Sequence, residues 1–346
     1  MGTEGMDEAS NMKVVLKHYV SGSAQETDMH LTAGTMKLKA PDDSNAVVVK
    51  NLFLSCDHYM IFKMTKHDRY ADPYPLGSPI TGYGVAKILD SAHPDFAIDE
   101  LVWGITGWEE YSLISDTTNL IKIEHPDVPL SYYTGILGMP GMTAYVGFYE
   151  LCAAKKGDHV FISAACGGVG QLLGQFAKLH GCHVVGSAAS PEKVDLLKNK
   201  YGFDEAFNFK DEPDYNATLK RYFPEGIDIY FDNVGGKMLD AVLLNLRANA
   251  CVVMCGMITH YHLEQPEGIH NLPLMVNKEA RIQGYLAVDY YHLYPKYLET
   301  ILPLIKASKV VYVEDVADGL ENAAKALVRM LSGRNVGKQV VAVNFL

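Results

Sequence analysis

The chain has 346 residues, a length typical of about two domains, and 48% of them are hydrophobic, as a globular core requires. Its formal net charge of −11 excludes the basic surface by which proteins bind nucleic acid. It has no apolar run long enough to span a membrane, no apolar signal core in residues 1–8, and six scattered cysteines without a disulfide framework. We therefore expect a soluble cytoplasmic protein that acts on a small molecule.

The first third of the chain consists of short apolar runs separated by glycine and proline. Residues 1–11 look like a mobile tail, and the glycine-rich segment 77–84 continues the pattern of short strands. The expected strands are 12–20, 46–56, 85–89 and 100–104. This pattern predicts a β-barrel-like domain, which ends near Leu137, where the pattern changes to helix with an amphipathic segment at 142–154.

Residues 158–193 have the pattern of a strand, a glycine turn, a helix and a second strand. The turn contains Gly167 and Gly170, with Gly174 one helical turn later. Glycines at such a turn allow the backbone to approach a pyrophosphate, which then lies on the helix N–H groups. The segment predicts a dinucleotide site; the alternative is a tight turn that binds nothing.

The end of the second strand indicates which dinucleotide is bound. NAD sites usually have an acidic residue there, but residues 187–190 contain none, and Lys193 follows. A carboxylate would repel a 2′-phosphate, whereas Ser190 and Lys193 provide groups that bind one. The sequence therefore favours NADPH; the alternative for Lys193 is a solvated lysine in the first turn of a helix.

The rest of the chain continues the alternation of helices and buried strands. The expected helices are 194–201, 238–247 and 294–306, and the expected strands are 227–235, 250–256, 281–285 and 338–343. Ligands of such sheets bind at the carboxyl ends of the strands. Three ends carry polar or aromatic groups, at 232–233, 255–261 and 284–287. Asn233 is a candidate to bind a cofactor hydroxyl, or a turn residue before Gly235.

Three segments, 164–178, 230–236 and 255–261, together with most of the rest of the chain, resemble the zinc-free medium-chain dehydrogenase/reductases. Among these the chain is most similar to the plant NADPH-dependent double-bond reductases, also called 2-alkenal reductases, and it is similar to prostaglandin reductases. The resemblance implies an α/β fold, with a GroES-like β-barrel-type substrate domain beside a doubly wound Rossmann domain. It implies that residues 1–134 and 302–346 form the substrate domain and that 135–301 bind NADPH.

The resemblance also implies the residues of the site. Tyr59 and Tyr83 are expected near the substrate, and a homodimer is expected to form through 250–254, 282–286 and the loop between them. The expected NADPH-binding residues are Gly167, Gly168, Val169, Gly170, Ser190, Lys193, Phe209, Asn233, Cys255, Tyr261, Tyr285, Leu286, Ala287 and Asn335.

Four residues depart from the family pattern. His58 replaces a proline before Tyr59, so the substrate loop is expected to differ in shape. Phe209 replaces a tyrosine near the 2′-phosphate, which leaves more of the binding to Lys193. Cys166 replaces a serine in the glycine turn, and Ala189 replaces a glycine at a place where a methyl group can be tolerated.

No ligand set for zinc is evident in the sequence. A catalytic zinc needs three Cys, His or carboxylate ligands, and a structural zinc needs a cysteine quartet. Cys56 is present, but the segment around Gly82 lacks the later His-Glu pair. The histidines of one loop, His260, His262 and His270, are read as a polar surface rather than a metal site. We predict an enzyme without a metal.

Without a metal, another group must stabilise negative charge on a substrate oxygen, and a tyrosine hydroxyl is the natural donor. Tyr261 is the candidate; the alternative is a loop aromatic packed on the surface. We predict NADPH-dependent reduction of the C=C bond of α,β-unsaturated aldehydes and ketones. The alternatives are a quinone or carbonyl reductase on the same fold, or a catalytically silent NADPH-binding protein.

Overall fold

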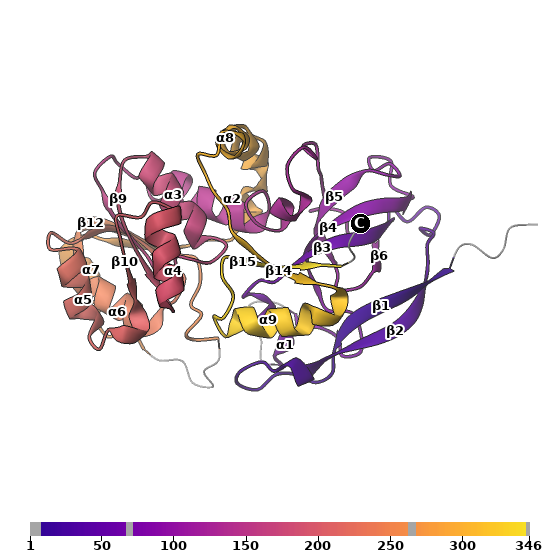
Figure 1. Ribbon diagram of the computed structural model, residues 1–346, viewed down its shortest axis with the longest axis horizontal. Helices are drawn as coiled ribbons and strands as arrows, with labels where there is room; N and C mark the ends of the chain where they lie inside the picture. The colour runs from indigo at the N-terminus through magenta and orange to yellow at the C-terminus, as the bar shows by residue number, and fades with distance from the viewer. Residues whose placement is uncertain (1–7, 67–71, 262–267, 344–346) are drawn as a thin grey trace, which may run out of the picture. The chain divides into compact units, whose positions relative to one another are not determined.

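The computed structural model describes residues 8–66, 72–261 and 268–343, which fall into two compact units (Figure 1). Unit 1 combines Met1–Gly138 with Glu314–Leu346, and unit 2 is Met139–Val313. The fold class predicted from the sequence, an α/β protein with a parallel sheet and a separate, largely antiparallel β unit, is confirmed.

Unit 1 is built on a sheet of order β14-β15-β3-β4-β5-β7, with β6 also paired to β3, and on the hairpin β1-β2. Its strands are β1 (Glu8–Leu16), β2 (Met29–Lys37), β3 (Val47–Ser55), β4 (Thr81–Ser91), β5 (Leu101–Gly107), β6 (Tyr111–Ile114), β7 (Ile121–Lys122), β14 (Glu314–Asp318) and β15 (Lys338–Ala342). Its helices are α1 (Met60–Met64) and α9 (Ala323–Leu331), with short 3₁₀ turns η1 (Glu26–Asp28), η2 (Leu130–Thr134) and η7 (Leu320–Asn322). Trp103 and Trp108 are fully buried in this unit.

The expected mobile tail of residues 1–11 is partly wrong. Residues 8–11 belong to β1, where they pair with residues 34–37 of β2, and residues 1–7 lie outside the described part of the chain. The alternation in β1 begins at Asn11, whose side-chain amide donates to the Glu109 carboxylate and to the Tyr111 carbonyl, both at 2.9 Å. A polar start to a strand was therefore read as a loop.

Unit 2 has a six-stranded parallel sheet of order β10-β9-β8-β11-β12-β13. The strands are β8 (His159–Ile162), β9 (His183–Ala188), β10 (Glu205–Asn208), β11 (Ile227–Asp232), β12 (Leu246–Met254) and β13 (Arg281–Gly284). Numbered in chain order, the strands lie in the order 3-2-1-4-5-6 that is typical of a dinucleotide-binding sheet. The direction in which successive strands are added to the sheet reverses between β8 and β11. Ligands of such sheets bind at the carboxyl ends of the strands beside that reversal.

Helices cover both faces of this sheet. The helices are α2 (Met139–Tyr145), α3 (Gly170–Leu179), α4 (Pro191–Asp195), α5 (Tyr215–Tyr222), α6 (Gly236–Leu244), α7 (Leu274–Lys278) and α8 (Tyr294–Lys306). Shorter turns of other helical types are η3 (Val146–Leu151), η4 (Leu196–Lys200), η5 (Phe209–Asp211) and η6 (Ala287–Leu293). Figure 1 shows α3 and α4 on one side and α5, α6 and α7 on the other. Leu172, Leu173 and Phe176 bury the apolar stripe of α3.

Two expected helices end differently in the structure. The helix expected over 238–247 ends at Leu244, and Arg247 belongs to β12, where its guanidinium binds the Asp228 carboxylate at 2.8 Å. The segment expected to be helical over 142–154 is α2 followed by the π-helical η3, which ends at Leu151. The expected bounds of α8 match those of the structure.

The compact units divide at residues 138 and 313, whereas the sequence placed the divisions at 134 and 301. A division at 301 would cut α8. Beyond α8, two buried glutamines of α3 hold the chain to unit 2: Gln175 binds the backbone of Val311 through both amide atoms at 2.8 Å, and Gln171 binds Val313 at 2.9 and 3.2 Å. These side-chain contacts carry no periodic signal in the sequence.

Candidate functional site

The turn between β8 and α3 lies at the reversal point of the sheet. Within the described residues, the backbone N–H groups of Gly168, Val169 and Gly170 donate to no protein acceptor. They open a helix of ten residues, so they and the helix dipole present a positive end. The turn therefore fits a pyrophosphate.

The glycines of this turn have different roles. A Cβ on Gly167 would have only the Ala164 carbonyl oxygen, at 3.4 Å, within contact distance, so this position is open to an approaching ligand. A Cβ on Gly170 would lie 2.7 Å from the Cα of Ala165, and one on Gly174 would lie 2.0 Å from the ring of Phe203. Gly170 and Gly174 therefore allow α3 to pack closely, and Gly174 has no role toward a ligand.

A group of hydrogen-bonded residues, Ser163, Tyr230, Asp232, Val234 and Gly235, joins this turn to the end of β11 and is called the hub below. Asp232 is fully buried, and its Oδ1 accepts from the Tyr230 hydroxyl at 2.7 Å and from the N–H groups of Val234 and Gly235 at 2.9 and 2.8 Å. The Ser163 hydroxyl lies 3.4 Å from the same oxygen. Burial raises the pKa of Asp232, while these hydrogen bonds oppose the shift. The hub holds the turns that end β8 and β11 in one arrangement.

Asn233 is the third member of this junction. Its side-chain amide donates to the Ser163 carbonyl at 2.7 Å, and its backbone N–H donates to the Ser163 hydroxyl at 3.0 Å. The Asn233 amide thus supports the turn after β8. Binding of a cofactor hydroxyl by Asn233 stays a prediction.

The expected 2′-phosphate residues lie at the carboxyl ends of β9 and β10. Asn208 pairs with Ala188, so Phe209, the next residue along, is beside the segment that leads to Ser190. The Ser190 hydroxyl accepts from the Lys193 backbone N–H at 3.4 Å and caps α4. The ring of Phe209 packs on the apolar cluster of unit 2. The β9–β10 register thus brings Ser190, Lys193 and Phe209 to one end of the sheet.

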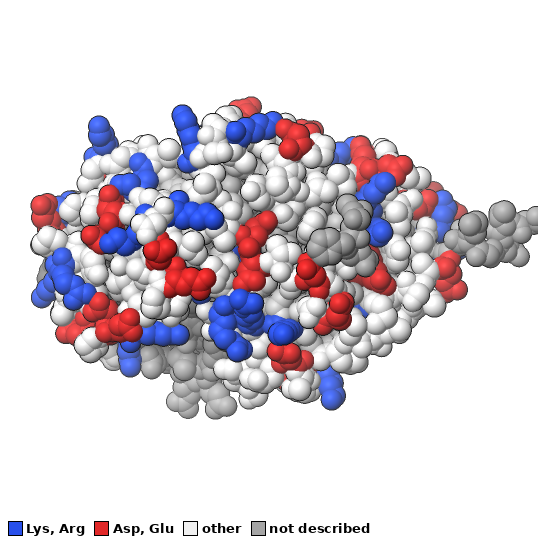
Figure 2. Space-filling model, viewed as in Figure 1, with Lys and Arg blue, Asp and Glu red and all other residues white. Residues whose placement is uncertain are grey.

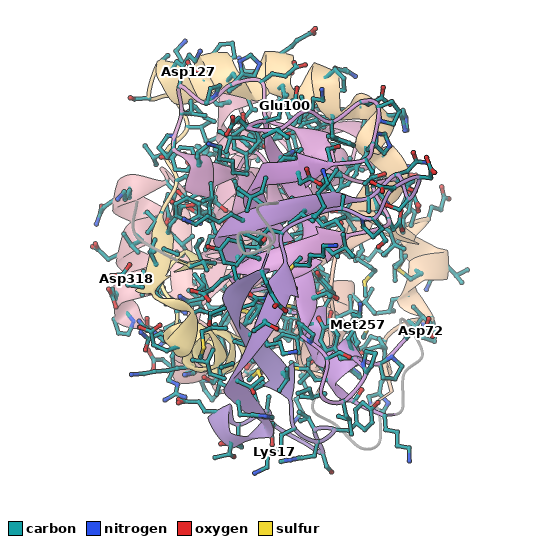
Figure 3. The ribbon with its side chains drawn as sticks, turned by 90° about the vertical axis from the view of Figure 1, so that its right-hand side faces the viewer. Lys17, Asp72, Glu100, Asp127, Met257 and Asp318 are labelled. Atoms are coloured by element: carbon teal, nitrogen blue, oxygen red, sulfur yellow. The ribbon has the colours of Figure 1, made fainter. Side chains whose placement is uncertain are left out.

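The loop after β12 is fastened to the turn after β11. The N–H groups of Cys255 and Gly256 donate to the Asp232 carbonyl at 2.9 and 3.0 Å, and that of Thr259 donates to the Val234 carbonyl at 3.1 Å. Tyr261 lies in this hydrogen-bonded loop, and its hydroxyl oxygen accepts a hydrogen bond from the N–H of Met257 at 3.0 Å. Met257 is labelled in Figure 3. The accepted hydrogen bond stabilises negative charge on the phenol oxygen and so makes the hydroxyl a stronger donor.

Gly256 lies beside the Tyr261 hydroxyl. A Cβ on Gly256 would lie 3.0 Å from that oxygen, so a side chain there would displace it. Sequence reasoning named Tyr261 as a candidate and Asp232 only as part of a polar strand end, and it did not consider Gly256 or Ser163. The motif around Asp232 was visible in the sequence, yet its acceptor role depends on donors from β8 and from the next turn.

The remaining expected cofactor residues of unit 2 lie at the ends of β12 and β13. The Tyr285 hydroxyl donates to the Thr143 carbonyl at 2.6 Å, so its side chain packs toward α2. Burial raises the pKa of the Cys255 thiol to about 12, so this thiol is neutral. Leu286 is 67% exposed, and Ala287 begins η6.

Unit 1 contains the other expected residues, Tyr59, Tyr83 and Asn335. Tyr59 precedes α1 and Tyr83 lies in β4; their rings meet edge to face with centroids 6.2 Å apart. The Tyr59 hydroxyl is buried, and burial raises its pKa, while a hydrogen bond from the Tyr83 backbone opposes the shift. Asn335 donates to the Gly337 carbonyl at 2.7 Å in the turn before β15.

Among the described residues, no three His, Cys, Asp or Glu side chains are grouped so that they can bind a metal ion. Burial raises the pKa of the Cys56 thiol to about 12, which disfavours the thiolate that a metal needs. His262, one of the loop histidines considered above, lies outside the described residues. Independence from metal stays a prediction.

We expect a chelator to leave the activity unchanged, and elemental analysis to find less than one zinc per chain. The physical reason is the missing ligand set. Incubation with a strong chelator, followed by gel filtration and assay, measures this directly. Activity that disappears on chelation and returns with added zinc would contradict the prediction.

Comparisons with known proteins agree with this geometry. A family model described as "Zinc-binding dehydrogenase" matches residues 168–306, and one described as "N-terminal domain of oxidoreductase" matches residues 12–123. The 2-alkenal reductase (NADP(+)-dependent) of Nicotiana tabacum is 63% identical over 339 residues, which cover 98% of this chain and 99% of that protein. The chain belongs to the double-bond reductases of the medium-chain dehydrogenase/reductase family. The resemblance stated from the sequence is confirmed.

A second relative and a solved structure also match nearly the whole chain. The (+)-pulegone reductase of Mentha piperita is 58% identical over 337 residues, covering 96% of this chain and 98% of the relative. The solved structure of CurA in complex with NADPH from Vibrio vulnificus is 32% identical, has a TM-score of 0.88, and covers 97% of this chain and 100% of that one. The double-bond reductase fold thus extends over both units of this chain.

Proposed function

We propose that this protein is an NADPH-dependent reductase of the C=C bond of α,β-unsaturated aldehydes and ketones. The observation that carries the proposal is the position of Tyr261, whose phenol oxygen accepts a hydrogen bond from the Met257 N–H, in a loop that is hydrogen-bonded to the turn after β11. The similarity to an NADP-dependent 2-alkenal reductase, 63% identical, and to a pulegone reductase, 58% identical, extends over nearly the whole chain and supports the proposal.

The carboxyl ends of the sheet fit NADPH. The donors of Gly168, Val169 and Gly170 would hold the pyrophosphate, and Ser190 and Lys193 would hold the 2′-phosphate beside Phe209. Asn233, Cys255, Tyr285, Leu286 and Ala287 would line the nicotinamide half, and the resemblance implies Asn335 as a further cofactor residue. When bound, NADPH supplies the hydride that is added to the β-carbon of the substrate.

Tyr261 then stabilises the charge that develops on the substrate. Addition of hydride at the β-carbon moves negative charge to the carbonyl oxygen, and a phenol hydroxyl can donate a hydrogen bond to it. The Met257 N–H shares the charge that shifts onto the phenol oxygen. The α-carbon then receives a proton from solvent or from Tyr261.

Tyr59 and Tyr83, both in unit 1, are the proposed substrate residues. The buried Tyr59 hydroxyl can donate a hydrogen bond to a substrate oxygen. The two aromatic rings suit planar, conjugated substrates such as alkenals, phenylpropenals and benzalacetone-type enones.

NADPH oxidation measured with and without an enal tests the proposal, and identification of the product separates the alternatives. A saturated aldehyde as product supports C=C reduction. An allylic alcohol as product indicates a carbonyl reductase, turnover only with quinones indicates a quinone reductase, and no turnover with bound NADPH indicates a silent binding protein.

We expect Lys193→Ala to raise the KM for NADPH about tenfold and to leave the KM for NADH little changed. The reason is loss of one charge-assisted contact to the 2′-phosphate, which is worth about 1.5 kcal/mol. Lys198→Ala is the matched control, because Lys198 lies on the following turn and pairs with Glu205 at 2.8 Å. Equal effects on both cofactors would refute the assignment of Lys193.

We also propose a homodimer formed through the edge of the unit 2 sheet. Within the described residues β13 pairs only with β12, so its outer edge has unpaired backbone groups. Apolar side chains beside it are exposed: Val276 by 79%, Leu286 by 67% and Ile282 by 37%. Light scattering at micromolar concentration should give twice the chain mass, and Ile282→Lys should give a monomer. A wild-type monomer would contradict the proposal.

The cellular setting is the last part of the proposal. All six cysteines are free, which fits a reducing compartment, and we propose the cytoplasm. Positive and negative side chains are interspersed on the face that Figure 2 shows, in keeping with a small-molecule enzyme rather than a nucleic-acid-binding protein. The helices of the described residues include none that could cross a membrane. The tobacco and peppermint relatives support a role in plant secondary metabolism.

A further inference from the structure

Two thiols and a guanidinium meet inside unit 2, away from the carboxyl ends of the strands where the cofactor is expected. Cys251 lies within β12 and pairs in register with Arg281 of β13. Cys152 directly follows η3. None of these three residues belongs to the site described above.

The contacts within this group are close. The Arg281 Nε lies 3.2 Å from the Cys251 sulfur, and the same guanidinium donates to the Leu151 carbonyl, beside Cys152. The Cys152 S–H donates to the Gly147 carbonyl at 2.9 Å, and the Cys152 sulfur is also within hydrogen-bonding reach of Cys251. Cys251 thus has a second thiol on one side and a cation on the other, an environment that favours a thiolate.

The charges separate the roles of the two thiols. The hydrogen bond from Cys152, together with the Arg281 guanidinium, lowers the pKa of Cys251 to about 6. The same hydrogen bond, burial and the neighbouring Cys182 raise the pKa of Cys152, against the opposing effect of Arg281. Burial raises the pKa of Cys56 and Cys255 to about 12 and that of Cys182 to about 11. At neutral pH, thiolate therefore concentrates on Cys251.

We propose that Cys251 is a peroxide-reactive site and that Cys152 is its resolving thiol. In the first step the Cys251 thiolate attacks one oxygen of hydrogen peroxide, the O–O bond breaks, hydroxide leaves, and sulfur is oxidised to sulfenic acid. In the second step the Cys152 thiol displaces the hydroxyl group, a disulfide forms, and water leaves. Peroxide supplies the oxidising equivalents for both steps.

The burial of Cys251 selects the oxidant. The residue is only 3% exposed, so a molecule close to water in size reaches it more readily than an alkenal does. A thiolate also adds to the β-carbon of enals, but this addition needs room for a carbon chain at the sulfur. The proposal is independent of the function proposed above, because neither cysteine is part of that site.

The test is a titration of the native, reduced protein with hydrogen peroxide at neutral pH, followed by peptide mapping without reduction. We expect a cross-linked pair of peptides joined through Cys152 and Cys251, with loss of two hydrogens. We expect it to form about tenfold or more faster than oxidation of Cys182, because even an unshifted thiol is only a few per cent thiolate at this pH, and burial raises the pKa of Cys182 to about 11. Oxidation of Cys182, Cys255 or Cys56 ahead of Cys251 would overturn the proposal.

Variants separate the two roles. Cys152→Ser should stop the reaction at the sulfenic acid, which a dimedone probe labels at Cys251. Arg281→Gln should move the midpoint of the pH–rate curve upward, whereas Arg281→Lys should restore part of the shift. Cys182→Ser is the matched control and should leave rate and product unchanged. A wild-type dimedone adduct without cross-link would refute the role of Cys152, and an enal adduct at Cys251 would refute the selection by size.

Discussion

We expect Tyr261→Phe to lower the rate of hydride transfer about a hundredfold. The variant keeps the ring and removes the hydroxyl, and loss of one donor to a developing oxyanion costs about 3 kcal/mol of barrier. The affinity for NADPH should change little, because the many other residues expected to bind the cofactor, such as those in the turns after β8 and β9, stay unchanged. Single-turnover NADPH oxidation at saturating enal measures the hydride-transfer step itself.

Two further variants sharpen this prediction. Tyr215→Phe, at the first residue of α5, is the matched control and should keep the wild-type rate. Gly256→Ala keeps the phenol but places a Cβ 3.0 Å from its oxygen, so it should lower the same rate by displacing the hydroxyl. If Tyr261→Phe transferred hydride at the wild-type rate, the assigned role would be wrong, and Tyr59 or Tyr83 would be the next candidates.

We expect Asp232→Ala to lower the free energy of unfolding of unit 2 by about 3 kcal/mol or more. The change leaves the Tyr230 hydroxyl and the N–H groups of Val234 and Gly235 without their acceptor, and an unmet buried donor costs about 1–3 kcal/mol. The midpoint temperature of thermal unfolding should fall by roughly 6–12 °C. Asp232→Asn is the matched control, since it keeps Oδ1 and alters Oδ2, which has no hydrogen-bond partner within the described residues.

The pKa of Asp232 adds a pH dependence to this comparison. Because burial raises the pKa in the folded protein above the ordinary value of 3.8, the folded state binds the proton more tightly than the unfolded chain does. The contribution of Asp232 to the free energy of unfolding is therefore greatest below that value, and it falls as the pH rises through the folded pKa. Asp232→Asn cannot titrate and should lack this slope. An identical slope in the variant, or an alanine variant as stable as wild type, would refute the role of Asp232.

The hub also links the two predictions. Asp232 binds the loop of Tyr261 through its carbonyl and the turn after β11 through its carboxylate. A partly folded Asp232→Ala protein should therefore lose both NADPH binding and hydride transfer, whereas Tyr261→Phe should lose mainly the latter. Measurement of cofactor affinity beside turnover distinguishes a damaged scaffold from a missing donor.

The sequence by itself determined the elements that depend on local patterns. The glycine turn before α3, the absence of an acid at residues 187–190, and the apolar runs of β8, β11 and β12 are each readable from neighbouring residues. Composition also excluded a nucleic-acid-binding role, since charge is additive along the chain. Family membership could be stated because these local motifs occur together and in order over nearly the whole chain.

The tertiary structure alone decided what depends on contacts between distant residues. Gln171 and Gln175 keep residues up to Val313 in unit 2, Asp232 receives donors from β8 and from the next turn, and Gly174 makes room for Phe203. Cys152 and Cys251 meet although 99 positions separate them in the sequence. Such contacts have no period and no fixed spacing, because the sheet order and register bring them together, and those are set by packing of the whole unit.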